Sequence, residues 1–113
     1  MSYKNGKIYK LTGNGNTYIG STIAPLDERL KDHKKHYKLY LKGKRPFLTS
    51  FKCMENNNVN NCKIKLLKNA KCNTYKQLLQ KESEQIIKNK CINSNIPSKK
   101  IKEKFKKNSK KNI

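Results

Sequence analysis

The 113-residue chain carries 28 lysines and arginines against seven acidic residues, which gives a formal net charge of +21 at pH 7. This charge predicts a polyanionic partner, most simply nucleic acid, although the codon bias of an AT-rich genome can also enrich lysine. The length allows one domain plus at most a tail. No apolar run approaches the roughly 20 residues of a membrane span, and no signal sequence opens the chain. We therefore predict a soluble, intracellular protein that is not secreted.

The N-terminal residues predict a β-hairpin. Residues 6–12 alternate in polarity and predict one strand, and residues 17–20 predict the returning strand. Between them, the Gly-Asn-Gly-Asn sequence at 13–16 predicts a tight turn, because both residue types tolerate positive φ. The hairpin brings Tyr9 and Tyr18 onto neighbouring strands.

A helix is expected after the hairpin. Pro25 suits its first turn, Gly43 is the stop signal, and apolar residues at helical spacing predict one buried face; they are Leu26, Leu30, Tyr37 and Leu41. A second, short helix is expected over residues 47–54, with Phe47, Leu48 and Phe51 buried. An asparagine-rich loop follows.

The later half predicts a third strand and a third helix. Residues 62–67 alternate in polarity and predict the strand. Asn73 or Thr74 is expected to cap a helix that runs to about residue 88; its buried stripe is expected to contain Tyr75, Leu78, Leu79, Ile86 and Ile87. Residues 91–97 are expected to cross back over the sheet.

These elements predict a small α+β fold, a three-stranded antiparallel β-sheet flanked by helices. Residues 1–97 are expected to form this domain, and the lysine-rich tail at 98–113 is expected to be disordered in isolation. The four cysteines contain no C-x-x-C pair, so we expect no zinc site. Cys62 and Cys91 are expected to pack as small apolar side chains.

Five residues of types that act on phosphate esters lie on these elements; they are Tyr9, Tyr18, Arg29, His33 and Glu82. The arginine and the histidine are four residues apart, on one face of the first helix. Glu82 lies one turn from Leu78 and one from Ile86, at the edge of the inward face, where a carboxylate is unusual. Glu84 points about 200° away from Glu82 and is expected to be solvated.

Each of the five also has a purely structural interpretation. The tyrosines can pack across the hairpin as strand aromatics, the arginine can be a solvated charge, and Glu82 can pair with Lys81 or Lys88. His36 is expected to be a surface residue. The five together, in this order on these elements, favour a functional site.

The same residues carry a resemblance to the GIY-YIG nuclease family. Ile8-Tyr9 is followed by Tyr18-Ile19-Gly20 and then by Arg29 and His33 on the next helix. Glu82 matches the helix that carries the family's metal-binding carboxylate, and Asn93 resembles the asparagine that follows it. The resemblance covers roughly residues 6–97 and looks closest to stand-alone members from large DNA viruses, which carry the pattern Cys72-Asn73, Glu82, Cys91-Ile92-Asn93.

The resemblance implies an endonuclease that hydrolyses DNA phosphodiester bonds with a single divalent ion, Mg²⁺ or Mn²⁺. Glu82 would hold the ion together with water and phosphate oxygens. Tyr9 would act as general base or orient the water, with its pKa lowered by positive charges. Tyr18 would hydrogen-bond the phosphate or the water, Arg29 would neutralise phosphate charge, and His33 would relay a proton or hold Tyr9.

The sequence departs from the family pattern at two places. Lys7 stands at the first glycine of the family's name, a variable position, and Lys44 and Arg45 stand where a second histidine often follows the first helix. The residues expected to contact nucleic acid are Lys31, Lys34, Lys35, Lys44, Arg45 and Asn93. Since no separate DNA-reading motif is present, we predict low sequence specificity, or targeting through a partner protein.

The family implies a virus or mobile element as the source, related to homing endonucleases, with the protein in host cytoplasm, viral factory or nucleus. Two alternatives stay open. One is a catalytically inactive, basic nucleic-acid-binding protein with the same fold. The other is a basic virion or ribosome-associated protein that binds RNA. The intact set of five favours the enzyme, because binding alone requires only lysines.

Overall fold

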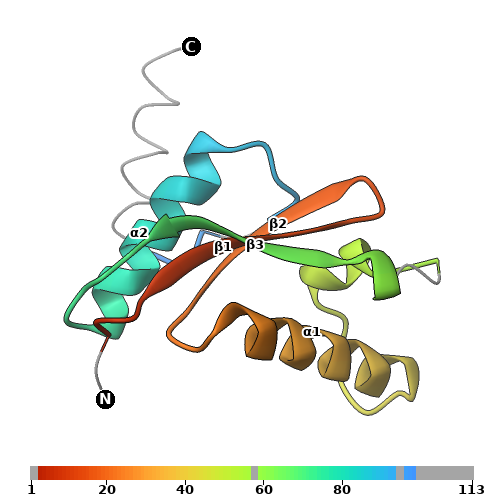
Figure 1. The fold of residues 1–113 in the computed structure, drawn as a ribbon. Coiled ribbons are helices and arrows are strands. Elements are labelled where there is room, and N and C mark those ends of the chain that lie inside the picture. The colour runs from red at the N-terminus through yellow and green to blue at the C-terminus, as the bar shows by residue number, and fades with distance from the viewer. Residues whose placement is uncertain (1–2, 57–58, 94–95, 99–113) are drawn as a thin grey trace.

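The computed structural model describes residues 3–56, 59–93 and 96–98, and it shows an α+β fold built on a three-stranded antiparallel sheet (Figure 1). The strands are β1 (Lys7–Gly13), β2 (Asn16–Thr22) and β3 (Lys63–Asn69), in the order β2-β1-β3. The first strand of the chain is therefore the central one. The predicted fold class is confirmed.

The predicted hairpin is confirmed, with β1 shifted by one residue and β2 longer than expected at both ends. Gly13 pairs with Asn16, so the loop has two residues, Asn14 with φ 56° and Gly15 with φ 75°. Positive φ at both positions defines a type I′ turn, whose twist matches that of the strands. This short loop fixes the register and places Tyr9 directly opposite Gly20.

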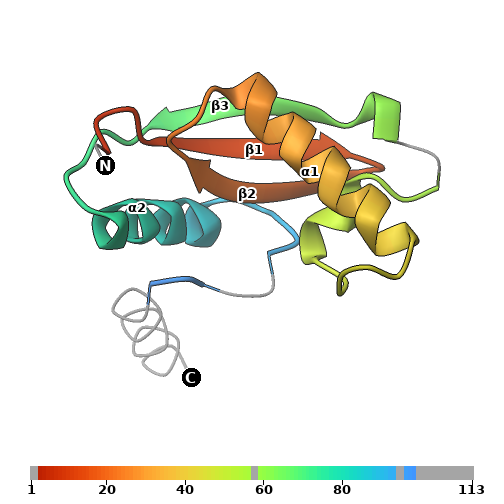
Figure 2. The ribbon, with the colours of Figure 1, turned by 90° about the horizontal axis from the view of Figure 1, so that it is seen from below.

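Two helices cover opposite faces of the sheet, α1 (Leu26–Leu41) and α2 (Tyr75–Lys88) (Figure 2). α1 ends in a Schellman motif: Gly43 has φ 73°, its N–H donates to the Tyr40 carbonyl, and the Lys44 N–H donates to the Leu39 carbonyl. Thr74 caps α2 by accepting a 3.1 Å hydrogen bond from the Gln77 N–H. The predicted stop at Gly43 and the predicted cap at Thr74 are therefore confirmed. Pro25, which was expected in the first turn of α1, instead precedes it in a non-helical conformation with ψ 145°.

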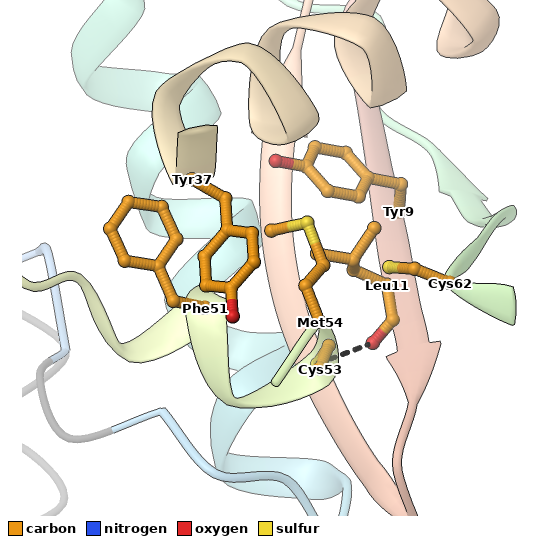
Figure 3. Packing of buried hydrophobic residues seen from close by; sticks show 7 residues of the cluster. All are labelled: Tyr9, Leu11, Tyr37, Phe51, Cys53, Met54 and Cys62. Carbon is orange, nitrogen blue, oxygen red and sulfur yellow. Dashed lines mark hydrogen bonds between the residues drawn. The ribbon is translucent and has the colours of Figure 1, made fainter. Parts of the chain in front are cut away.

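The alternation of β1 divides the core into two clusters, one on each face of the sheet. The cluster on the α1 face contains Tyr9, Leu11, Tyr37, Phe51, Cys53, Met54 and Cys62 (Figure 3). The cluster on the α2 face contains Ile8, Ile19, Ala70, Cys72, Leu78 and Ile86. Because Tyr9 belongs to the core of the α1 face, its ring is held in place by the packing of this cluster.

The predicted helix over residues 47–54 was wrong in length and in burial. A five-residue 3₁₀ helix, Thr49–Cys53, stands there. Phe51 is buried as expected, but Phe47 is 43% exposed and Leu48 is 38% exposed. Phe47 instead packs its ring on the outside of the cluster, 5.6 Å from the Tyr40 ring centroid.

Three other apolar residues expected in buried stripes are exposed. Leu41 is the last residue of α1 and is 63% exposed, and Tyr75 is the first residue of α2 and is 58% exposed. Ile87, next to the end of α2, is 36% exposed. Helical periodicity identifies the apolar face of a helix, but it does not show how far the sheet extends over that face. Apolar residues near the helix ends therefore stay in solvent where the sheet does not cover them.

The segment after α2 lies along the outer edge of β2 and does not cross the sheet as expected. The Ile92 N–H donates to the Thr17 carbonyl at 2.8 Å. Further on, the Ser98 N–H donates to the Ser83 hydroxyl at 2.9 Å, so Ser98 still packs on α2. The remainder of the predicted tail, 99–113, lies outside the described residues.

The cysteines in the structure are all free. Cys62 is buried as predicted, and Cys91 is half-buried. Within the described ranges, neither helix has the length and apolar character needed to cross a membrane.

Candidate active site

Four of the five predicted site residues line one cavity. Tyr9, Tyr18, Arg29 and Glu82 surround a space of about 530 Å³. The strands contribute the tyrosines, α1 contributes the arginine and α2 contributes the glutamate, so the cavity draws on both faces of the sheet. Its other end is aromatic and apolar, with the Tyr3 and Tyr75 rings 6.3 Å apart.

His33, the fifth predicted residue, stands behind Tyr9. The Tyr9 hydroxyl and His33 Nε2 form a buried hydrogen bond of 2.7 Å, and the two rings meet edge to face. The exposed fractions are 1% for Tyr9 and 4% for His33. Burial, followed by the nearby charge of Arg29, lowers the pKa of His33 to about 3. At neutral pH the imidazole is therefore uncharged and its Nε2 can accept the phenol proton.

Without a bound ion, burial raises the pKa of Tyr9, and the Arg29 charge, which lowers it, is the smaller effect. His33, which was also expected to lower this pKa, contributes no positive charge, because it is neutral. The phenol therefore keeps its proton at neutral pH in the metal-free protein. The part of the lowering that was expected from the metal stays a prediction.

Gly20 leaves space for the Tyr9 ring. The two residues are cross-strand partners, and a Cβ at position 20 would lie against the Tyr9 hydroxyl oxygen and 2.6 Å from its Cζ. A contact this close is not tolerated, so any other residue at position 20 would displace the ring. Position 20 requires glycine because the Tyr9 hydroxyl occupies the space that a Cβ would need.

A Gly20→Ala variant is expected to shift the Tyr9 ring and lose most nicking activity, with a decrease in the free energy of unfolding of about 1–3 kcal/mol. Plasmid nicking and urea denaturation would measure the two effects. The matched control is Gly15→Ala, where a Cβ meets nothing within 4 Å but φ is 75°. The control should lose stability through backbone strain and keep its activity. Equal activity losses in the two variants would contradict the role of Gly20.

Glu82 is half-buried and anchored by β2. Its Oε1 accepts a hydrogen bond of 2.5 Å from the Ser21 hydroxyl. Burial raises the pKa of Glu82, and the Ser21 hydrogen bond and the Arg29 charge oppose that shift. Glu84 is exposed, as predicted.

The donors around Glu82 suit a hard divalent cation. No cluster of three His, Cys, Asp or Glu side chains able to hold a metal occurs among the described residues. One carboxylate with a hydroxyl beside it, facing a cavity of about 530 Å³, nevertheless fits Mg²⁺, which keeps several of its waters and needs few protein ligands. Glu82 is the residue that would hold the ion.

Arg29 lies on the wall of the cavity, on the same face of α1 as His33. Its side chain is 29% exposed and forms a loose ion pair with Asp32, with 3.9 Å between Nη1 and Oδ2. Asp32 is largely exposed, so this pair is weak. The guanidinium is therefore free to exchange Asp32 for a phosphate.

Asn93 positions the strand that carries Tyr18. Its Oδ1 accepts from the Ile19 N–H at 2.8 Å, and its Nδ2 donates to the Ile19 carbonyl at 2.7 Å. One side-chain amide thus replaces a fourth strand at the edge of β2. These bonds engage both polar ends of the amide that we expected to contact nucleic acid, so the geometry favours a positioning role.

Asn93→Ala is expected to decrease the free energy of unfolding by about 1–3 kcal/mol, because the N–H and carbonyl of Ile19 would lose their partner. Asn89→Ala is the control, since the Asn89 amide is exposed and bonds only within its own helix turn. Urea denaturation of both variants is the measurement. An equal decrease in the free energy of unfolding in Asn89→Ala would show that the bonds between Asn93 and Ile19 do not stabilise the fold more than an exposed amide does.

The predicted nucleic-acid-binding lysines surround α1 without entering the cavity. Lys31, Lys35 and Lys44 are exposed and Lys34 is half-buried. None of them lines the site. Arg45 is half-buried, and its Nε atom has no hydrogen-bond partner among the described residues.

Sequence reasoning missed three residues of this region, Ser21, His36 and Ser50. His36 was expected on the surface, but it is half-buried and lines a second cavity beside Arg29. The spacing held a signal, because residues seven apart on a helix lie within about 20° of each other. No local signal marks Ser21 or Ser50, since only the tertiary fold brings them to the site.

Comparisons of the chain with protein-family models, with curated proteins and with solved structures found no match. The interpretation of the cavity therefore rests on its own residues.

Proposed function

We propose that the protein is a metal-dependent endonuclease of the GIY-YIG type that hydrolyses DNA phosphodiester bonds with low sequence specificity. The observation that supports this most is the hydrogen bond from Tyr9, on the wall of a cavity that also contains Glu82 and Arg29, to the neutral, buried His33 behind it. A binding protein needs cations and hydrogen-bond donors. A buried proton-transfer pair beside a half-buried carboxylate serves chemistry.

The Tyr9–His33 pair provides a path for the proton of the attacking water. With the imidazole proton on Nδ1, the Tyr9 hydroxyl donates to His33 Nε2 and can accept from the water. As the water oxygen bonds to phosphorus, its proton passes to Tyr9 and the Tyr9 proton passes to Nε2. Negative charge on the bound phosphate raises the pKa of the imidazole at that moment, so the relay favours the transition state.

The remaining residues stabilise charge. Arg29 pairs with the non-bridging phosphate oxygens through its planar fork, and the Tyr18 hydroxyl donates to the phosphate or orients the water. Glu82 would hold a divalent ion, and this ion, when bound, would supply positive charge to the phosphate and the leaving oxygen. The leaving oxygen takes its proton from solvent once the P–O bond breaks.

Plasmid nicking by the purified protein tests the proposal. Supercoiled DNA should become nicked in Mg²⁺ or Mn²⁺ and stay supercoiled in EDTA, and binding should weaken steeply with salt, at about −0.9 in log–log slope for each phosphate contacted. Faster cleavage of RNA than of DNA would show that RNA, and not DNA, is the preferred substrate. Tight binding without cleavage of plasmid, branched or single-stranded DNA would favour an inactive binding protein.

A further inference from the structure

A second, smaller cavity adjoins the first. It encloses about 200 Å³ and shares Tyr18 and Arg29 with the first cavity, so these two side chains form the wall between the two spaces. Its other lining residues are His33, His36, Leu48, Thr49, Ser50 and Asn93. The wall residues would touch the scissile phosphate on one side and the contents of this cavity on the other.

The second cavity differs from the first in its electrostatics. The first is lined by the carboxylates of Asp32 and Glu82, whereas no acidic side chain lines the second among the described residues. Arg29 is the cation that lines it, and the charges of Arg45 and, in the opposite sense, Asp32 reach His36. Burial lowers the pKa of His36, so His36 enters this lining as a neutral hydrogen-bonding group. A small space with an arginine, hydroxyls and no carboxylate in its lining is complementary to an anion.

One buried polar group in this region has no partner among the described residues. The Arg45 Nε atom is buried and unbonded there, and the Arg45 charge acts on His36, which lines the cavity. Buried polar groups are nearly always hydrogen-bonded, so a donor left unbonded in this region indicates a ligand that accepts hydrogen bonds. Ser50, which is only 3% exposed, lines the same cavity and supplies a hydroxyl.

We propose that this second cavity binds a phosphate adjacent to the scissile phosphate on the same DNA strand. The proposal rests on the proposed function, because it takes the first cavity as the place of cleavage. His36 and Ser50 would hold the second phosphate, with Arg29 between the two phosphates. The substrate is then a strand with at least two consecutive phosphates, and a compound with a single phosphodiester fills only half of the site.

A methylphosphonate scan tests this. The oligonucleotides, duplex and single-stranded, are short enough to bind in one register, and their cleavage position is first mapped with the wild-type protein. Each then carries one uncharged methylphosphonate at a successive position around the mapped phosphate, and its binding to the Glu82→Gln protein is measured without metal. We expect at least a tenfold loss of affinity at one position adjacent to the cleaved phosphate. When His36→Gln and Ser50→Ala are added to the protein, a methylphosphonate at the same position should cause almost no further loss of affinity. This protein should bind the unmodified strand about tenfold more weakly than the protein without the two changes.

Lys63→Gln is the control, because it removes one exposed charge from β3. It should weaken binding evenly across the scan, whereas the His36→Gln/Ser50→Ala change should remove one position from the profile. Thermal melting of each variant shows that it is folded. A profile that is flat beyond the cleaved phosphate, or an adjacent position that stays sensitive in the double variant, would overturn the proposal.

Two further arms separate this inference from its alternatives. If the wild-type protein nicks DNA but the scan is flat, the second phosphate site is wrong and the proposed function stands. If the protein nicks no DNA under any condition, the proposed function is wrong, and the scan still measures which phosphates contribute to binding. Inorganic phosphate that occupies the cavity, detected by His36 chemical shifts, together with a flat scan would show a site for free phosphate, which also overturns the proposal.

Discussion

A Glu82→Gln protein is expected to lose metal-dependent nicking by about a thousandfold or more. Glutamine keeps the shape of the side chain and can still bond Ser21, but it removes the only charge that would hold the ion on α2. The ion is worth several kcal/mol in the transition state, and each 1.4 kcal/mol is tenfold in rate. Plasmid nicking in Mg²⁺ and Mn²⁺, with saturating protein, is the measurement.

The DNA affinity and the melting temperature of this variant should not fall with its activity. DNA binding should be unchanged or tighter, because a negative charge leaves a surface that faces a polyanion. The melting temperature at neutral pH should rise: burial raises the pKa of Glu82 in the folded state, so the ionised carboxylate costs stability there. A variant that binds and folds at least as well but does not cleave would locate the loss in the chemical step.

Glu84→Gln is the matched control, since it makes the same change two residues away on the exposed side of α2. It should nick at the wild-type rate. Residual metal-dependent cleavage of more than a few per cent in Glu82→Gln would place the ion elsewhere.

Replacing Tyr9 with phenylalanine is expected to decrease nicking by about 10²–10⁴-fold, the usual contribution of a positioned proton-transfer group. The phenyl ring keeps its place among Leu11, Phe51 and Met54, so the fold should survive. His33 Nε2 loses its partner, which should cost about 1–3 kcal/mol of unfolding free energy. Single-turnover cleavage and DNA binding should be measured on the same preparation.

Tyr37→Phe is the control for this variant. Tyr37 is buried in the same cluster and lines neither cavity. It should cleave normally. If Tyr9→Phe also cleaves at the wild-type rate, Tyr9 has no place in the mechanism, and His33 would have to receive the water proton directly.

The hairpin and the order of the site residues could be predicted because their signals are local. The Asn14-Gly15 turn fixes the register, and the register alone puts Tyr9 opposite Gly20. The Gly43 stop and the Thr74 cap were visible in the sequence for the same reason. The strand and helix patterns put the tyrosines on neighbouring strands and Arg29 and His33 on one face of a helix, whereas only the resemblance indicated that these residues meet.

The parts that could not be predicted depend on distant segments meeting. The Ser21–Glu82 bond spans 61 residues and leaves no periodic pattern in the sequence. That burial of the Tyr9 hydroxyl outweighs the charge of Arg29 in the metal-free protein could not be predicted, because only the packed structure reveals this burial. The exposure of Tyr75 was missed because periodicity does not report where the sheet ends.

The contact between Ile19 and Asn93 spans 74 residues, and it links the edge of the hairpin that carries Tyr9 and Tyr18 to the part of the chain made after α2. During synthesis the basic residues of α1 leave the ribosome long before this contact can form, and non-local contacts of this kind form late in folding. On the proposed function, a chain that stops before residue 93 would hold DNA or RNA by charge without a completed edge on β2. We expect such prematurely terminated products to bind nucleic acid without cutting it.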